Sequence, residues 1–424
     1  MPHIAWLGKK TPLCGNVTYG LSTTEALKQR GHQTSFIHFH NPINPGDSKT
    51  SLLANDPEVS LPYLVKSQVY TIPSPRAQRE LRESLERLKP DLVHASLTLS
   101  PLDFRLPELC QQIKVPLVAT FHPPFDASIR NLTAGTQQLT YQLYAPSLAR
   151  YDRVIVFSEL QAEVLAKLGV KENRLAVIPN GVDTDLWRPA NKESLSSKQE
   201  EVRKRIGPER IFLYMGRIAT EKNIETLLRA WRQVEPKGCR LVIVGDGPLR
   251  STLENNSIGT PDSDILWWGY ETDLDTKIAL LQLAEVFLLP SLVEGLSLAL
   301  LEAMATGTAC VATDAGADGK VLEGGAGIVL STQGVTTQLK TLLPVLRDQK
   351  VLTTELGRRA RMRVLERYTL TTNIDALETL YQDLLSIGKS KNNLNLIPDS
   401  SEQQQRQPQL MQNENLPFQD DAML

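Results

Sequence analysis

The sequence predicts an α/β protein made of two Rossmann-like domains that face each other across a cleft. Short apolar runs of strand formers alternate with helix patterns, and this alternation forms two blocks, residues 1–187 and 206–366. Residues 188–205, between the blocks, are rich in Ser, Lys, Glu and Gln, which is typical of a linker between domains. The 424 residues are enough to build two full cores.

The first block opens with a strand, a loop, a helix and a second strand. We expect the loop over 8–19, with Cys14-Gly15-Asn16 inside it, and a helix over 20–29 that ends at Arg30-Gly31-His32. Residues 41–62 hold several Pro and Asn and are assigned no regular structure. The strands expected in this block are 3–7, 34–39, 91–95, 115–120, 153–157 and 174–178, and the further helices are 75–88, 106–113 and 159–168.

The second block repeats the pattern and ends in a helix and a polar tail. Its expected strands are 211–215, 240–244, 265–268, 286–289 and 308–313, and its helices include 223–234 and 296–306. A closing helix is expected at 377–387. Residues 389–424, in which Gln and Asn are abundant, predict a disordered tail.

Composition excludes several classes of function. The formal net charge is -2, so nucleic acid is not indicated as a partner, although the first 190 residues are net positive, with 20 Lys+Arg and 17 Asp+Glu. The four Cys are far apart and match no metal or redox motif, which fits a reduced cytosol. No run of about 20 apolar residues could cross a bilayer, and the N-terminus lacks the order of a signal peptide.

Two carboxylates mark the most informative stretch of the chain. Glu294 stands in the turn after the strand at 286–289, and Glu302 stands inside the otherwise apolar helix at 296–306. A lone carboxylate in such a place is most simply a structural hydrogen-bond acceptor. Two of them, eight positions apart around a helix N-terminus that can hold an anion, indicate instead a ligand with hydroxyls and a diphosphate.

Two cations follow an earlier strand of the same block. Arg217 and Lys222 lie five positions apart in the loop after 211–215, where they could neutralise a leaving diphosphate. Taken alone, they could equally be ordinary surface cations. Gly245-Asp-Gly247 also follows a strand, but it lacks the third Gly and the spacing of a dinucleotide site.

With these motifs the chain resembles the retaining, nucleotide-sugar-dependent glycosyltransferases of family 4, whose two-domain fold is called GT-B. The resemblance extends over about residues 3–387 and rests mainly on the segment 290–307. It is strengthened by four shorter motifs, Gly216-Arg217 with Glu221-Lys222, Val244-Gly-Asp-Gly-Pro248, Ile178-Pro-Asn-Gly-Val-Asp183 and Arg30-Gly31-His32. In this fold the end of the chain crosses back onto the first domain, so the resemblance implies a crossover region over 367–388.

The resemblance implies roles for four charged residues. Arg217 and Lys222 match the pair that holds the donor diphosphate in the family. Glu294 matches the carboxylate that contacts sugar hydroxyls, and Glu302 matches the one that contacts the ribose.

It also implies roles for residues around these charges. His122 matches a His that lies beside the donor sugar, whereas without the resemblance it would be read as a loop His bonded to backbone. Backbone amides of Gly295, Leu296 and Ser297 would face the donor. Gly15 matches one position of the family's Gly-Gly pair, the other position being Cys14 here, so close approach of the donor phosphate would rest on one Gly.

The implied reaction is transfer of a hexose, with retention, from a nucleotide sugar, most simply UDP-galactose or UDP-glucose. The leaving phosphate oxygen would take the acceptor proton, so the enzyme chiefly positions the reactants and stabilises charge. We expect no cofactor and no metal, because no Asp-x-Asp motif is placed to hold a metal with the donor.

The acceptor is expected to be a glycerolipid at a membrane surface. The first domain resembles those of enzymes that glycosylate diacylglycerol lipids, such as the cyanobacterial type of digalactosyldiacylglycerol synthase, which extends monogalactosyldiacylglycerol. Its excess of cations and its apolar loops at 101–107 and 121–125, with Phe104, Phe121 and Phe125, would suit a cytoplasmic protein bound peripherally to an anionic bilayer. The helix at 75–88 offers three cations for this contact, Arg76, Arg79 and Arg82.

Other functions stay open at this stage. The apolar loop residues could simply pack inside the domain, and the acceptor could be a soluble molecule or a polysaccharide. A nucleotide-sugar epimerase of similar fold would need its own acid and base carboxylates in the cleft. A non-catalytic scaffold is disfavoured because Arg217, Lys222 and Glu294 are all present.

Overall fold

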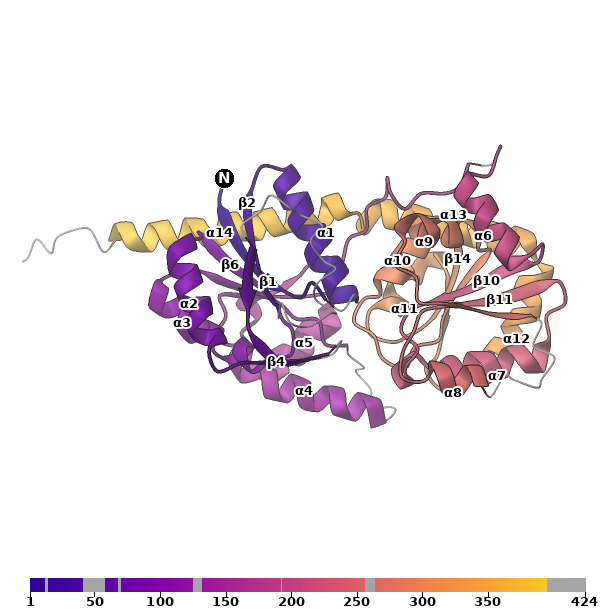
Figure 1. The fold of residues 1–424 in the computed structure, drawn as a ribbon, viewed down its shortest axis with the longest axis horizontal. Coiled ribbons are helices and arrows are strands. Elements are labelled where there is room, and N and C mark those ends of the chain that lie inside the picture. Colours follow the sequence, from indigo (N-terminus) through magenta and orange to yellow (C-terminus); the bar gives the residue numbers. More distant parts are fainter. Residues whose placement is uncertain are drawn as a thin grey trace, which may run out of the picture.

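The computed structural model describes residues 1–11, 14–40, 58–67, 70–124, 132–191, 193–255 and 264–394. Two α/β domains lie side by side, each with a parallel sheet packed between helices (Figure 1). This confirms the predicted architecture of two Rossmann-like domains.

The first domain contains a seven-stranded parallel sheet in the order β3-β2-β1-β6-β7-β8-β9 and a small antiparallel hairpin of β4 and β5. Its strands are β1 (His3–Gly8), β2 (Gln33–Phe39), β3 (Glu58–Leu61), β4 (Tyr63–Lys66), β5 (Thr71–Pro73), β6 (Leu92–Ser96), β7 (Leu117–Thr120), β8 (Arg153–Val156) and β9 (Leu175–Val177). Its helices are α1 (Gly15–Gln29), α2 (Ala77–Leu88), α3 (Leu106–Ile113), α4 (Leu132–Leu148) and α5 (Glu159–Lys167), with short 3₁₀ turns η1 (Pro101–Phe104) and η2 (Glu172–Arg174).

The second domain contains a six-stranded parallel sheet in the order β12-β11-β10-β13-β14-β15. Its strands are β10 (Arg210–Met215), β11 (Cys239–Val244), β12 (Ile265–Gly269), β13 (Val286–Leu289), β14 (Ala309–Thr313) and β15 (Ile328–Leu330). Its helical elements are α6 (Ser197–Ile206), η3 (Thr220–Lys222), α7 (Ile224–Val234), α8 (Arg250–Asn255), α9 (Leu274–Leu283), α10 (Leu298–Ala305), α11 (Asp318–Val321), η4 (Glu323–Gly325), α12 (Val335–Asp348) and α13 (Lys350–Arg367).

Strand order identifies the place in each sheet where a ligand is expected. The chain builds outward in one direction and then in the other, so the order reverses between β1 and β6 in the first sheet and between β10 and β13 in the second. In open α/β sheets, ligands bind beyond the carboxyl ends of the strands at such a switch point. The loops after β10 and β13 carry Arg217, Lys222 and Glu294, so the fold places all three at the switch point of the second sheet.

The last helix, α14 (Leu370–Leu394), crosses from the second domain and lies along the first (Figure 1). A buried stripe of Ile374, Leu377, Tyr381 and Leu384 packs with strand residues of the first sheet. Burial of each such side chain contributes on the order of 1.5–3 kcal/mol, so this helix helps to hold the two domains together. At its start, Arg30 and His32 contact Glu378, with Nη1–Oε2 and Nε2–Oε1 distances that are both 2.6 Å. The Arg-Gly-His motif therefore anchors the crossover helix.

Several sequence expectations about local structure were wrong. Gly15 is the first residue of α1 and not part of a loop, because the extended backbone of Cys14 already lets the helix begin there. The segment 58–61 forms β3 and pairs with β2; alternate burial of its side chains, with Val59 and Leu61 inside, is the pattern of an edge strand. The remainder of 41–57 lies outside the described residues.

The linker and tail boundaries also differ from the expectation. The expected linker over 188–205 contains most of α6, which Ser196 and Gln199 start with a capping box and which buries Val202 and Ile206. Helix α14 continues through 389–394, where a tail was expected, because adding residues to an existing helix is easier than starting one. Residues 395–424 lie outside the described residues. Among the described helices, none combines the length and the apolar character that a membrane crossing requires.

Candidate active site

The loop that carries Arg217 is supported by a second loop from β11. Gly245 has a φ of +136°, and a Cβ there would stand 1.9 Å from the carbonyl oxygen of Gly216. A Cβ at Gly247 would stand 2.3 Å from the carbonyl oxygen of Ile218, whose amide donates to the backbone carbonyl of Asp246 at 2.9 Å. Only glycine permits this close approach. The Gly-Asp-Gly motif therefore fixes the backbone that presents Arg217.

The loop that carries Glu294 is supported in the same way from β14. Gly316 has a φ of +58°, and a Cβ there would stand 2.0 Å from the carbonyl oxygen of Glu294. The amide of Ala317 donates to the carbonyl of Gly295 at 2.8 Å, and buried Asp318 accepts from the amide of Ser297 at 2.9 Å. Burial, reinforced by nearby Glu294, raises the pKa of Asp318 well above its usual range. A neutral carboxyl therefore braces this loop.

The predicted diphosphate cations each have a carboxylate partner within the loops. Lys222 pairs with Glu294, whose Oε1 also accepts from the hydroxyl of Ser291 at 2.7 Å. Arg217 pairs with Glu221, one helical turn along the same loop. The Arg217 and Lys222 side chains keep 33% and 19% of their exposure, so both can still reach a ligand. The structure thus brings Arg217, Lys222 and Glu294 together.

The backbone amides of Gly295, Leu296 and Ser297 differ in whether the described residues offer them a hydrogen-bond acceptor. Among the described residues, no hydrogen bond is recorded for the amides of Gly295 and Leu296. The amide of Ser297 is occupied by Asp318, and its hydroxyl accepts from Leu300 as the N-cap of α10. The expectation that the Ser297 amide faces the donor is therefore wrong in this structure, because a buried carboxyl already takes that hydrogen bond.

Glu302 lies in the second turn of α10. Removal of its carboxyl from water raises its pKa to about 7, and Lys277 moderates the rise. The side chain keeps partial exposure, and no hydrogen bond or ion pair is recorded for it among the described residues. A carboxylate that is poorly solvated and unpaired is a ready acceptor for ligand hydroxyls.

The first domain contributes His122 from the end of β7. Its Nε2 lies 2.8 Å from the Oγ of Ser96, which in turn donates to Oδ1 of Asn16 at 2.8 Å. The Asn16 amide nitrogen donates to the carbonyl of Leu97, which fixes this orientation. Ser96 must therefore accept from Nε2–H of His122. Burial, with a contribution from Lys9, lowers the pKa of His122 to about 3, so the ring is neutral near pH 7 and its Nδ1 holds a lone pair.

The two domains meet at these residues. A Cβ built on Gly295 would lie 3.5 Å from the carbonyl oxygen of His122. Asn180 donates to the carbonyl of Leu296 at 2.8 Å, which also joins the domains. The fold therefore places His122 against the loop of Glu294. Gly15 is exposed at the start of α1, and a Cβ there would meet nothing within 4 Å, so the space beside it is open.

Sequence reasoning did not single out some residues that shape this site. Asn16 and Ser96 orient His122, Glu221 pairs with Arg217, and Asp318 braces the Glu294 loop. Glu221 and Asn16 belong to segments that the sequence analysis names, Glu221-Lys222 and Cys14-Gly15-Asn16. Ser96 and Asp318 act across long sequence separations, and no local pattern identifies them.

The chain has three Asp-x-Asp sequences, and the two that lie wholly within the described residues do not contribute to this set; the third, at 262–264, lies partly outside them. Asp183 of Asp183-Thr-Asp185 accepts from the amides of Asp185 and Leu186, both at 3.0 Å. Asp273 of Asp273-Leu-Asp275 is the N-cap of α9 and accepts from the amide of Thr276. Within the described ranges, no group of three or more His, Cys, Asp or Glu is placed to hold a metal ion.

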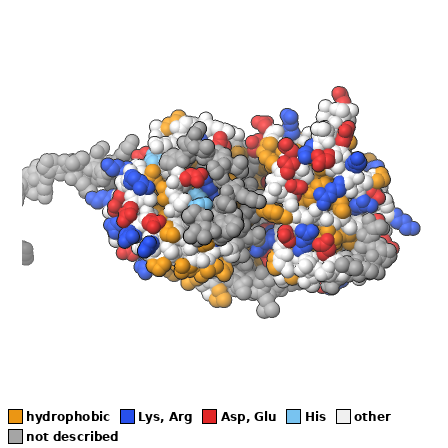
Figure 2. Space-filling model, in the orientation of Figure 1, with side chains coloured by type: hydrophobic (Ala, Val, Ile, Leu, Met, Phe, Trp, Pro, Cys, Tyr) orange, Lys and Arg blue, Asp and Glu red, His pale blue; other side chains and the backbone are white. Residues whose placement is uncertain are grey.

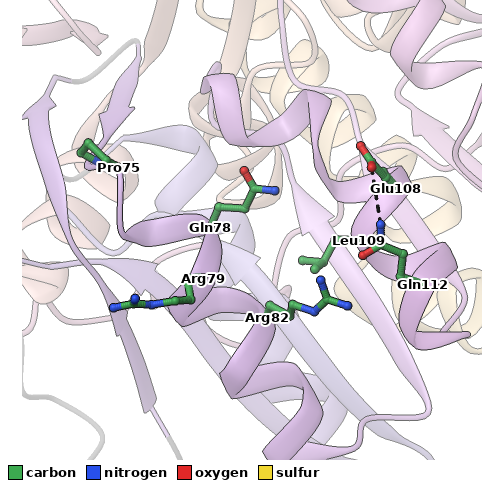
Figure 3. Close-up of a pocket in the computed structure, with 7 residues that line it drawn as sticks. All are labelled: Pro75, Gln78, Arg79, Arg82, Glu108, Leu109 and Gln112. Atoms are coloured by element: carbon green, nitrogen blue, oxygen red, sulfur yellow. Dashed lines mark hydrogen bonds between the residues drawn. The ribbon is translucent and has the colours of Figure 1, made fainter.

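A groove of about 480 Å³ lies away from this site, between α2 and α3 (Figure 3). Two of the predicted membrane cations line it, but Arg82 donates to Glu86 at 3.0 Å and Arg79 lies 3.7 Å from Glu83. Such pairs are typical of a solvated helix face. The groove is lined by Pro75, Gln78, Arg79, Arg82, Glu108, Leu109 and Gln112.

Two of the three aromatic residues proposed for membrane contact pack inside the first domain. Phe121 is fully buried, and its ring packs against Tyr141 and Tyr144. Phe104 is partly buried against the same core. Phe125 lies outside the described residues. Ordinary packing accounts for Phe104 and Phe121.

Comparison with known proteins agrees with this geometry. A family model described as Glycosyltransferase Family 4 matches residues 15–186, and one described as Glycosyl transferases group 1 matches residues 209–348. The solved structure of Anabaena HepE in complex with UDP-glucose matches 90% of this chain and 100% of its own, with a TM-score of 0.73 and 16% identity. At that identity the likeness shows the fold, which is GT-B.

Curated relatives are distant. An Escherichia coli UDP-Gal:alpha-D-GlcNAc-diphosphoundecaprenol alpha-1,3-galactosyltransferase is 27% identical over 55% of this chain and 60% of its own length. A sulfoquinovosyl transferase of Arabidopsis thaliana is 26% identical over 75% of this chain and 61% of its own length. The chain thus spans about 60% of the length of these relatives. Together with the two family models, they indicate a GT-B glycosyltransferase.

Proposed function

We propose that this GT-B glycosyltransferase moves a hexose, with retention of configuration, from a nucleotide sugar to a glycerolipid at a membrane surface. The proposal rests chiefly on one observation. Arg217, Lys222 and Glu294 lie in the loops at the switch point of the second sheet and close to His122 of the first domain, beside the amides of Gly295 and Leu296, which have no hydrogen-bond partner among the described residues.

The donor we propose is UDP-galactose or UDP-glucose. Its diphosphate would replace carboxylates as the partner of Arg217 and Lys222, and the amides of Gly295 and Leu296 would add neutral donors. Glu302 would accept from the ribose hydroxyls and Glu294 from the sugar hydroxyls. A relative whose name includes UDP-Gal and a solved neighbour in complex with UDP-glucose support the choice of base and sugar.

The chemical step we propose needs no covalent intermediate. The acceptor oxygen forms a bond to the anomeric carbon on the face from which the diphosphate leaves, and the bond from that carbon to the phosphate oxygen breaks. The acceptor proton passes to the leaving oxygen. Arg217 and Lys222 stabilise the charge that develops there, and neutral His122, held by Ser96, lies where its ring can contact the sugar. We assign charge neutralisation to these side chains rather than to a metal.

The lipid acceptor is the finer part of the proposal. A relative named for a diphosphoundecaprenol acceptor supports a lipid-linked substrate. We propose specifically that the enzyme adds galactose to monogalactosyldiacylglycerol and yields digalactosyldiacylglycerol, as a cytoplasmic protein bound peripherally to a membrane.

One experiment tests donor, acceptor and stereochemistry together. The purified chain is incubated in detergent with UDP-galactose or UDP-glucose and with monogalactosyldiacylglycerol or diacylglycerol, with and without EDTA. Mass spectrometry should detect the digalactosyl lipid at equal rate in EDTA, and NMR of the product should show an α-linkage. Interconversion of the two nucleotide sugars without acceptor would indicate an epimerase, and transfer only to water-soluble acceptors would refute the lipid assignment.

A further inference from the structure

Helix α4 is an unusual surface helix. Its 17 residues include no Asp, Glu, Lys or Arg. One face is buried in the first domain through Tyr141, Tyr144 and Leu148. Leu139 and Leu143, one turn apart, are each 64% exposed on another face. A solvated helix face normally carries charge, so this face is suited to an apolar neighbour.

The β4–β5 hairpin exposes apolar side chains in the same region. Leu64 is 65% exposed, Tyr70 45% and Ile72 40%. The hairpin and α4 both pack beside η1. The amide of Thr71 donates to the carbonyl of Leu99 just before this turn, and the hydroxyl of Tyr144 donates to Asp103 within it.

Figure 2 shows apolar side chains gathered along the lower edge of the first domain, where Figure 1 places β4 and α4. We call this surface the apolar edge and define it as Leu64, Tyr70, Ile72, Leu139 and Leu143.

The segments that carry the apolar edge, 59–79 and 132–151, hold cations and no acidic residue. Acidic residues flank the first of them, with Glu58 and Glu80 at its ends and Glu83 3.7 Å from Arg79. The same segments carry exposed Arg76, Arg79 and Arg150. Exposed leucines and a tyrosine beside arginines match the layered chemistry of an anionic bilayer, with acyl chains beneath phosphates.

The apolar edge also adjoins the loops that form the cleft. The Nζ of Lys66, in the hairpin, donates to the Oγ1 of Thr11, in the loop before α1. The hydroxyl of Tyr141, in α4, donates to the carbonyl of Pro123, next to His122. A membrane held at this surface would therefore lie beside the first domain's side of the cleft.

We propose that the apolar edge inserts into the interfacial layer of an anionic membrane and brings the cleft to a bilayer acceptor. This inference rests on the proposed function, since it names the surface through which that function would reach its lipid. It replaces the aromatic loop residues of the sequence prediction with Leu64, Tyr70, Ile72, Leu139 and Leu143.

Vesicle flotation tests the apolar edge with the full chain. The probes are vesicles of phosphatidylcholine alone and of phosphatidylcholine with phosphatidylglycerol. Wild type should bind the anionic vesicles, and L139Q/L143Q and L64Q/I72Q should each lower the bound-to-free ratio at least tenfold. R76Q/R79Q should lower it a few-fold at low salt only, because screened surface charges act weakly.

The matched control is V351Q/M362Q on α13, which removes two apolar side chains that are 83% and 56% exposed on the second domain. It should bind vesicles as wild type does. Calorimetric affinity for UDP should be equal in all these proteins, which shows that each variant folds.

Three results would overturn the inference. In the first, the wild-type protein does not bind anionic vesicles, and in the second, the edge variants bind them as well as wild type does. The third is a dimer in solution that the L139Q/L143Q substitutions convert to a monomer. The last would assign the surface to a second copy of the chain. If edge variants lose vesicle binding while no lipid is ever glycosylated, the surface stands and the proposed acceptor fails. If lipid is glycosylated in detergent while vesicle binding is unchanged in the variants, the proposed acceptor is supported and the apolar edge is refuted as the membrane-binding surface.

Discussion

The two sides of the cleft handle their polar groups differently. On the second domain, Arg217 pairs with Glu221 of its own loop, and Lys222 pairs with Glu294 of the loop after β13. On the first domain, Asn16, Ser96 and His122 form a neutral chain of hydrogen bonds. Ion pairs can exchange one anion for another, whereas a neutral buried chain holds one geometry. The comparison supports the proposal that the second domain binds the charged part of the donor and the first domain positions the reactants.

The neutral hydrogen bonds of the first domain continue from the cleft into its interior. His94 bonds to the hydroxyl of Tyr381 at 2.5 Å and to Thr120 at 2.7 Å, and its ring stacks on Trp6 with centroids 4.0 Å apart. Tyr381 belongs to α14, so the crossover helix is tied to the strands that end at His122. Burial lowers the pKa of His94 to about 3.

The largest expected effect comes from removing a cation of the second domain. Arg217→Ala and Lys222→Ala should each lower turnover by ~10²–10³, because loss of one charge partner at a developing phosphate charge costs ~2–4 kcal/mol. Steady-state kinetics with UDP-galactose measures this, and circular dichroism checks the fold. Arg229→Ala removes an exposed cation paired with Glu225 on the same domain and should leave turnover unchanged. Near-normal turnover in both site variants would refute the diphosphate assignment.

The buried neutral His94 of the first domain should make the free energy of unfolding fall at acid pH. Because the folded pKa of His94 lies below its ordinary value of 6.5, the unfolded chain binds more protons between pH 6.5 and 3. Stability is therefore lost as pH falls through this window, by ~3 kcal/mol at pH 4.5 from His94 alone. Urea unfolding at pH 7 and pH 4.5 measures it.

The variant His94→Gln should be less stable at pH 7 but lose less stability on acidification, while His40→Gln should follow wild type. An equal loss in His94→Gln and wild type would mean that other groups control the acid response.

The carboxylate of Glu302 should matter for nucleotide affinity rather than for the sugar. Glu302→Gln should weaken UDP binding about tenfold, since a hydrogen bond to a charged group contributes ~1.5–3 kcal/mol. Its pKa of about 7 adds a pH signature. The group gains charge as pH rises through 7, so the wild-type affinity for UDP should rise from pH 6 to pH 8 more than that of the variant. Calorimetry that shows equal affinities and slopes would remove the ribose role, whereas Glu294→Gln should chiefly impair use of the sugar.

The smallest effect concerns the ion pair that UDP would have to displace. Glu221→Gln should raise UDP affinity a few-fold, because it removes the carboxylate that competes with phosphate for Arg217. Affinity for uridine, which has no phosphate, should not change. Glu225→Gln is the control, since Glu225 pairs with Arg229 at 2.9 Å on an exposed helix face. Weaker UDP binding in Glu221→Gln would show that the pair orients Arg217 instead of competing for it.

The sequence by itself determined the fold class and predicted most of the residues that we propose for the second domain's site. Glu294, Glu302, Arg217 and Lys222 were identified because strand, turn and helix follow one another locally there, and the loops of a parallel sheet bring such motifs to one edge. Buried strands such as β13 could also be predicted from the sequence, since a strand buried on both faces is a continuous apolar stretch.

Tertiary structure alone decided the rest. Ser96 is 80 residues from Asn16 and 26 from His122, so only sheet pairing brings them together. Ser297 differs from Gly295 and Leu296 because Asp318, 21 residues later, takes its amide. Phe121 and Leu139 look alike as apolar residues, yet one is buried and the other 64% exposed. The physical reason is the same in each case. The burial and the hydrogen bonds of a residue depend on which distant segment of the chain packs against it, and the local sequence does not specify that segment.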